Sequence, residues 1–119
     1  MTYAEIEAYS LTKPEAELCF PFDWETPVIK ICGKMFFLGV PKDETPRINL
    51  KGIPDENAAL RAMYKAITPG YHMNKEHWNS LYLDGSVPDD MQKQMVDESY
   101  RLVVKGLPKG QRERLLAAK

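Results

Sequence analysis

The apolar positions near the start and in the middle of the chain recur with the spacing of amphipathic helices. Thr2 followed by Glu5 is a capping-box pattern, so we expect a first helix that ends before Pro14. A second helix is predicted to begin at Pro54 and to end at the breaker sequence Thr68-Pro69-Gly70. Its apolar stripe consists of Leu60, Met63, Tyr64 and Ile67.

A third and longer helix is predicted in the last third of the chain. Ser86 is the expected N-cap, Pro88 lies just inside the first turn, and Gly106 with Pro108 ends the helix. Residues 111–119 are predicted to add one short helix. The apolar positions of the long helix are Met91, Met95, Val96, Tyr100, Val103 and Leu107.

Shorter apolar runs, separated by Pro and Gly, predict strands between these helices. Residues 28–32 and 35–40 are rich in β-branched and aromatic side chains, and Gly33-Lys34 is predicted as the two-residue turn of a hairpin that joins them. Residues 47–51 alternate strictly between polar and apolar side chains. Residues 77–85 alternate again, with Leu81 and Leu83 expected to face inward and Trp78, Ser80 and Tyr82 to lie on the opposite face. Both segments are therefore expected to be strands with one face exposed to solvent.

The order of elements predicts an α+β fold with two layers. We expect one antiparallel sheet of about five strands with the helices packed on one face. Residues 1–119 form a single domain of ordinary size, because no repeat or long linker divides the sequence.

Composition and charge narrow the functional classes. The longest apolar run is far shorter than a membrane span, and the acidic N-terminus lacks the features of a signal peptide, so a cytoplasmic protein without membrane association is expected. The oligomeric state is left open, with a monomer favoured. Cys19 and Cys32 are expected to be free, partly buried thiols, because neither has a partner at metal-ligand spacing.

The net charge of −1 gives no global attraction to nucleic acid, but the charges are unevenly distributed. Residues 1–27 hold six acidic and one basic side chain, which is a net charge of −5. Residues 100–119 hold six basic and one acidic side chain, which is +5. Charged helix ends commonly produce such a pattern, so a solvated surface explains it as well as a binding site does.

Cations and aromatic residues recur on the polar side of the predicted strands. Such a surface suits nucleic acid, because Lys and Arg neutralise phosphates and aromatic rings stack on bases. Strand alternation also produces ordinary solvated faces with the same residue types. The candidate residues on this face are Lys30, Arg47, Asn49, Lys51, Trp78 and Tyr82.

The segment 72–78 carries the densest run of polar chemistry, and it supplies His72, Asn74, Lys75, His77 and Trp78 as candidate contacts. A metal site is not expected, since the five-residue gap between the histidines fits neither a helix face nor a strand face. Asn74 and the histidines have an alternative structural role in bonding the loop backbone. No catalytic motif, phosphate loop or cofactor signature is found, so we expect a protein that is not an enzyme.

The stretch Thr68–Pro88, TPGYHMNKEHWNSLYLDGSVP, resembles the most characteristic part of the YjbR/MmcQ family. Supporting similarity spans roughly residues 3 to 115 and includes Lys13-Pro14, Gly33 to Phe36, Asn49 to Lys51 and Asp97 to Tyr100. The resemblance implies a two-layer fold similar to that of secretion chaperones, together with a double-wing DNA-binding motif.

Two functions follow from these observations. The first is weak, salt-dependent DNA binding through the basic and aromatic sheet face and the segment His72 to Trp78. The alternative is a protein-binding adaptor without a nucleic-acid role, which the chaperone-like architecture and six Met residues favour.

Overall fold

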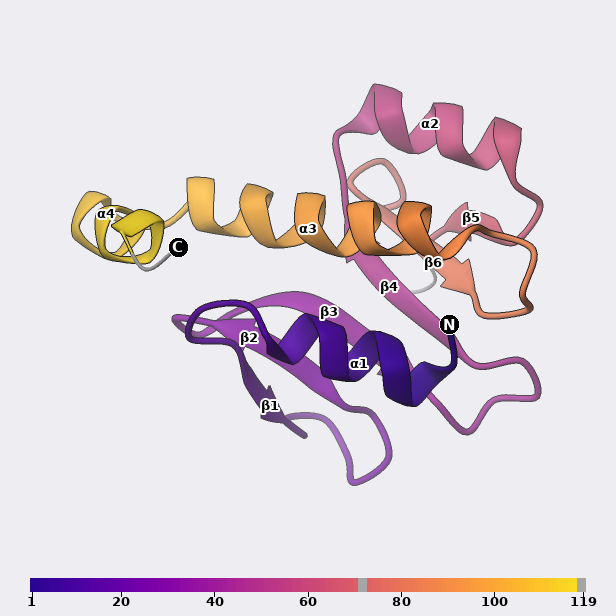
Figure 1. The fold of residues 1–119 in the computed structure, drawn as a ribbon, viewed down its shortest axis with the longest axis horizontal. Coiled ribbons are helices and arrows are strands. Elements are labelled where there is room, and N and C mark those ends of the chain that lie inside the picture. The colour runs from indigo at the N-terminus through magenta and orange to yellow at the C-terminus, as the bar shows by residue number, and fades with distance from the viewer. Residues whose placement is uncertain (71–72, 118–119) are drawn as a thin grey trace.

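The computed structural model, which describes residues 1–70 and 73–117, contains four helices and one six-stranded sheet (Figure 1). The helices are α1 (Tyr3–Leu11), α2 (Pro54–Met63), α3 (Asp89–Lys105) and α4 (Lys109–Ala117), which lies at the end of α3. The strands are β1 (Glu17–Cys19), β2 (Val28–Ile31), β3 (Lys34–Val40), β4 (Arg47–Lys51), β5 (Ile67–Pro69) and β6 (Trp78–Tyr82). All neighbouring strands are antiparallel, in the order β1-β2-β3-β4-β6-β5, which confirms the predicted fold class.

The predicted second helix is too long. α2 ends at Met63, because Tyr64 takes an extended conformation with φ −129° and ψ 122°. Ile67 fits the helical stripe by spacing, but it lies in β5, where it pairs with Leu81 of β6. The pairing with β6 therefore overrides a local helical pattern at this point, and Met63 is left 66% exposed.

The hairpin turn between β2 and β3 lies one residue earlier than the sequence predicts. Cys32 and Gly33 form the turn, with φ values of 48° and 79°, and Lys34 is already the first residue of β3. A two-residue hairpin of this kind requires positive φ at both central positions. The glycine adopts such a value readily, whereas Cys32 is held in a conformation that non-glycine residues seldom take.

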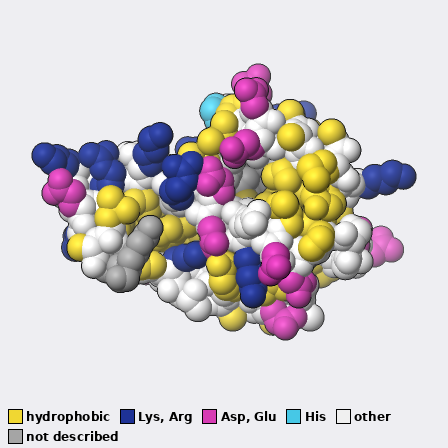
Figure 2. Space-filling model, turned by 45° about the horizontal axis from the view of Figure 1, so that its top comes forward, with side chains coloured by type: hydrophobic (Ala, Val, Ile, Leu, Met, Phe, Trp, Pro, Cys, Tyr) yellow, Lys and Arg dark blue, Asp and Glu magenta, His cyan; other side chains and the backbone are white. Residues whose placement is uncertain are grey.

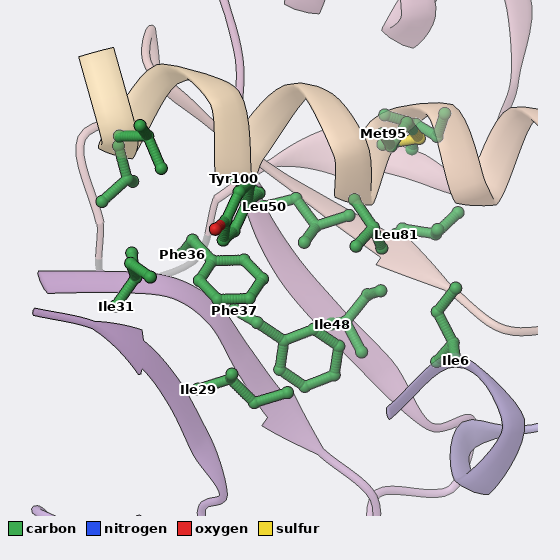
Figure 3. Packing of buried hydrophobic residues seen from close by; sticks show 14 of the residues in the cluster. Ile6, Ile29, Ile31, Phe36, Phe37, Ile48, Leu50, Leu81, Met95 and Tyr100 are labelled. Carbon is green, nitrogen blue, oxygen red and sulfur yellow. The ribbon is translucent and has the colours of Figure 1, made fainter. Parts of the chain in front are cut away.

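A β-bulge on β3 places two adjacent aromatic side chains in the core. Ile29 pairs with Phe37, but the next residue of β2, Lys30, pairs with Met35, so Phe36 is an extra residue. Phe36 and Phe37 are both fully buried as a result (Figure 3). The bulge also keeps the side chains of Lys30 and Met35 on the opposite side of the sheet.

Helices α1 and α3 cover this apolar face. The ring of Tyr100 on α3 meets Phe36 edge to face at 5.3 Å between centroids (Figure 3). Tyr3 on α1 meets Phe37 at 6.2 Å. Gly39 of β3 makes the second contact possible, because a Cβ at this position would overlap the Tyr3 hydroxyl. The core therefore depends on the fit between specific rings and a glycine.

The first helix begins as predicted, and the third does not. The Thr2 hydroxyl accepts a hydrogen bond from the Glu5 N–H at 3.1 Å, and the Glu5 carboxylate accepts one from the Thr2 N–H at 2.8 Å. In contrast, Ser86 does not cap α3. Its N–H and hydroxyl donate to the Asp84 carboxylate, while Pro88 occupies the N-cap position without a side-chain hydrogen bond.

The oppositely charged ends of the sequence meet in the fold. Arg114 on α4 forms a two-pronged ion pair with Glu15, at 2.7 and 2.8 Å, and Lys13 pairs with Asp97 on α3. Part of the charge asymmetry is thereby neutralised within one molecule. Cys19 and Cys32 are free and half-buried, and no helix within the described ranges is long and apolar enough to cross a membrane.

Candidate nucleic-acid interface

The face of the sheet away from α1 and α3 carries the predicted cations and aromatic rings in register. Arg47 on β4 lies directly opposite Tyr82 on β6, and Lys51 lies opposite Trp78. Residues paired across an antiparallel ladder share one face, so these four side chains form two cation–aromatic rows. All four are half-buried. We call this surface the open face.

Lys30 extends the open face toward the hairpin. It pairs with Met35 and alternates with Ile29, whose side chain lies on the helix-covered face with Phe37. The middle of the open face is apolar, because Val28 pairs with Leu38 there. Lys30 is therefore on the predicted face, but its strand lies two positions from β4 and three from β6.

Arg47 is already engaged within the protein. Its guanidinium forms an ion pair with Asp43 and stands over the Tyr82 ring at 5.8 Å from the centroid, and the side chain is only 15% exposed. The ion pairs among the described residues do not include Lys30, Lys51 or Lys75. These lysines are consequently the cations with charge available for phosphate, whereas Arg47 is placed to hold the Tyr82 ring.

Asn49 lies between the two rows but is 2% exposed. Its Oδ1 accepts a hydrogen bond from the hydroxyl of Ser80, its cross-strand neighbour, which is also buried. A buried, hydrogen-bonded amide contributes to strand pairing rather than to a solvent-facing contact.

Residues 75–77 form a turn that leads into β6. The Asn74 Oδ1 accepts hydrogen bonds from the N–H groups of Glu76 and His77, at 3.0 and 3.2 Å, so its side chain holds the turn. Lys75 and His77 are exposed. The structural role proposed for Asn74 is thus present, and His72 lies outside the described residues.

Backbone contacts fix this turn to β4 and α2. The Gly52 N–H donates to the His77 carbonyl at 2.9 Å, and the Asn57 side-chain amide of α2 donates to the Glu76 carbonyl at 3.0 Å. Lys75 is therefore carried by an anchored turn, directly before the Trp78 row.

The sequence did not reveal the buried polar network under α2. Arg61 donates to the Asn79 Oδ1 at 2.8 Å, and the Asn79 amide donates to the Asn57 carbonyl at 3.3 Å. Asn79 is 1% exposed on the helix-covered face, opposite Leu50. In the sequence, the signal for this network was Asn79 itself, which is a polar residue at an inward position of the strand.

Two further surface features lie on the helix side. Figure 2 shows Lys and Arg side chains gathered over α4 and the end of α3, where Lys105 and Lys109 are exposed. The same view shows hydrophobic side chains gathered over α2 and the start of α3. A groove of about 590 Å³ runs between these two helices, with Leu50, Leu60, Met91 and Met95 among its apolar lining.

No group of three His, Cys, Asp or Glu side chains within residues 1–70 and 73–117 is arranged to hold a metal ion. His77, which lies within the described residues, is exposed on the turn.

Comparisons with known proteins agree with the fold. The model of the YjbR family matches residues 11–102. The chain is 35% identical to the uncharacterized protein YjbR of Escherichia coli K12 over 116 residues, which is 98% of each chain. It is 40% identical to the uncharacterized protein YbdF of Escherichia coli O157:H7 over 106 residues, covering 89% of this chain and 87% of that protein.

Solved structures extend the comparison. The Deinococcus radiodurans protein DR2400, described as a DUF419 domain, superposes with a TM-score of 0.88 at 35% identity and covers 96% of this chain and 87% of its own. A Pseudomonas syringae protein has a TM-score of 0.74 at 24% identity, with 86% and 98% covered, and supports the fold alone.

Proposed function

The chain belongs to the YjbR family, and from this premise we propose that it binds nucleic acid, with DNA as the first candidate, through the open face and the Lys75 turn. The observation that carries the proposal is the register of β4 and β6, which sets Lys51 beside Trp78 and Arg47 beside Tyr82. In this role the protein acts by binding and not by catalysis, in the cytosol.

The chemistry of the two rows fits a strand of nucleic acid. Lys51 and Lys75 would neutralise phosphates, while Trp78 and Tyr82 offer ring faces to bases. Arg47 would fix the Tyr82 ring rather than contact a phosphate, because Asp43 already occupies its guanidinium. This division of roles predicts a small number of phosphate contacts and therefore modest affinity.

Charge sets the conditions for binding. The net charge of −1 gives no long-range attraction, so affinity depends on a few local lysines and should fall steeply as salt rises. Half-buried aromatic rings on a sheet suit bases that are unstacked, which favours single-stranded over duplex DNA.

A titration tests the proposal directly. Fluorescently labelled single-stranded DNA, duplex DNA and RNA of equal length are titrated with the protein at low and at moderate salt. We expect binding at low salt that weakens as salt rises, with single strands bound most tightly. Absence of binding to all three at low salt would reject the proposal.

The α2–α3 groove favours a second candidate function, a protein-binding adaptor. Its lining includes Met91 and Met95, whose flexible side chains adapt to different apolar partners, and exposed Met63 lies on the same helix pair. The groove opens on the helix-covered side of the sheet, and it adjoins the open face at Lys51, which belongs to the lining of both. Replacing Met91 with Lys should then abolish partner binding while leaving any nucleic-acid binding unchanged.

A further inference from the structure

The segment from Leu18 to Trp24 exposes an unusual amount of apolar surface. Seven large hydrophobic side chains are exposed among the described residues, and four of them lie here. Their exposed fractions are 41% for Leu18, 46% for Phe20, 68% for Phe22 and 92% for Trp24. Single exposed apolar residues are normal on a protein surface, but four large ones within seven consecutive residues are typical of an interaction site. We call this segment the aromatic loop.

The aromatic loop is held in shape by its own polar contacts. The Asp23 carboxylate accepts hydrogen bonds from the Glu25 N–H at 2.8 Å and the Thr26 hydroxyl at 3.1 Å. Three residues after the loop, the carbonyl of Pro27 accepts a hydrogen bond from the Gly39 N–H of β3 at 2.8 Å. The rings are therefore presented by an ordered segment, which lowers the entropy cost of docking.

The loop continues directly from a sheet edge. β1 is the outermost strand, it consists of three residues, and within the described part of the chain it pairs only with β2. The opposite edge strand, β5, ends in Pro69, which cannot donate a ladder hydrogen bond. The edge at β1 contains no proline, so it is the edge at which the sheet is open to a further strand.

Charge around the aromatic loop is close to balanced. Glu25 forms an ion pair with Lys42 at 3.1 Å, and Glu17 lies opposite Lys30 on the neighbouring strand. The carboxylate of Asp23 is turned to the loop backbone. A nearly neutral apolar patch gives no attraction for a polyanion or for a strongly basic partner, and it favours an apolar surface of the same kind.

We propose that the aromatic loop and the edge of β1 form an interface with a second copy of this chain. At the usual 150–250 Å² of an aromatic side chain, the exposed fractions of Phe20, Phe22 and Trp24 amount to roughly 300–500 Å² of apolar surface, to which Leu18 adds. A stable complex buries at least about 600 Å² on each partner, so these side chains supply most of the smallest adequate interface and the β1 edge supplies the rest. A two-fold axis brings the same patch together from both copies and closes the assembly as a dimer.

The dimer interface is separate from the two cation–aromatic rows on β4 and β6, and Lys30 is the open-face cation that lies next to β1. β1 and β6 are four strand positions apart, which corresponds to roughly 19 Å across the sheet. The two proposals can therefore fail independently: loss of the dimer leaves the binding rows of one chain intact.

Sedimentation of the full chain from roughly 5 µM to 500 µM tests the dimer, because this range spans the dissociation constants of moderate interfaces. The expected result is a monomer–dimer equilibrium in the parent. The double variant Phe22→Ser and Trp24→Ser should raise the dissociation constant by at least about 100-fold, since buried aromatic residues dominate such interfaces. Met63→Ser is the matched control, because it removes a 66% exposed apolar side chain on α2, and it should leave the equilibrium unchanged.

Circular dichroism establishes that each variant is folded. A parent that remains monomeric at the highest concentration overturns the proposal, and so does a dimer that the double variant leaves intact. The DNA titration on the double variant separates the two proposals, since its sheet-face binding per chain should equal that of the parent.

Discussion

The two faces of the sheet use the same strands for different purposes. On β4, Ile48 and Leu50 are buried under the helices, whereas Arg47 and Lys51 alternate with them on the open face. Neighbouring residues of β4 therefore face opposite sides of the sheet, one toward the core and the next toward the candidate interface. Substitutions of the core-facing Ile48 and Leu50 should mainly lower stability, whereas replacement of Lys51 should mainly affect binding. The buried Val28 and Asn49 of the open face belong with the first group.

The largest difference is expected between Phe37→Ala and Lys51→Ala. Phe37 is fully buried, and its truncation leaves a cavity that should lower the free energy of unfolding by about 3–5 kcal/mol. Lys51→Ala should change it by less than about 0.5 kcal/mol. Urea denaturation measures both values. Equal losses would show that the open face is part of the core.

A second test addresses the packing of α1 on the helix-covered face. Gly39→Ala places a methyl group into the Tyr3 hydroxyl and should cost about 1–3 kcal/mol. Tyr3→Phe removes that hydroxyl, so the Gly39→Ala substitution should cost less in the Tyr3→Phe background. A double-mutant cycle from denaturation curves measures this coupling. Strict additivity would contradict the contact.

Asn74 tests whether the turn beside the open face is structural. Its side chain accepts two backbone hydrogen bonds, so Asn74→Ala should lower stability by about 1 kcal/mol. Asn74→Asp keeps both acceptors and serves as the matched control, with a smaller loss. If Asn74→Ala weakens DNA binding at unchanged stability, Asn74 is a contact residue instead.

The smallest effect is expected from the titration of Tyr3 on the helix-covered face, which changes stability at alkaline pH and not near neutral pH. Burial raises the pKa of Tyr3 above its ordinary value of 10.0, so the folded state retains a proton that the unfolded chain releases. This contribution is fully present below pH 10 and is lost as the pH rises beyond it. Tyr3→Phe should flatten the fall in stability above pH 10, as measured by denaturation at pH 9 and at roughly pH 11. An unchanged pH profile would argue against burial of the hydroxyl.

The sequence predicted much of the fold because most elements carry a clear period. Alternation located β4 and β6, and Arg47, Lys51, Trp78 and Tyr82 share one face, whereas the polar Asn79 lies on the other. The strands β1 and β5 have three residues each, which is too short for a period to appear. The end of α2 was misplaced because Ile67 satisfies the helical stripe by spacing, although pairing with Leu81 decides its conformation.

The site could be predicted only as a set of residue types. Alternation assigns Arg47 and Lys51 to one face, but the order of β4 beside β6 and the ion pair with Asp43 depend on tertiary structure. The segment Leu18 to Trp24 is apolar, and its composition alone would suit a buried strand. Only the fold places its aromatic side chains outside the core.

The most direct test of the open face is the salt dependence of DNA binding in Lys51→Ala with Lys75→Ala. The matched control is Lys65→Ala with Lys93→Ala, which removes the same charge from the α2–β5 connection and from α3. We predict that the open-face double variant flattens the slope of log affinity against log salt by up to about two units, while the control retains the parental slope and both remain folded. Equal slopes in the parent and the open-face variant would contradict the assignment of the interface.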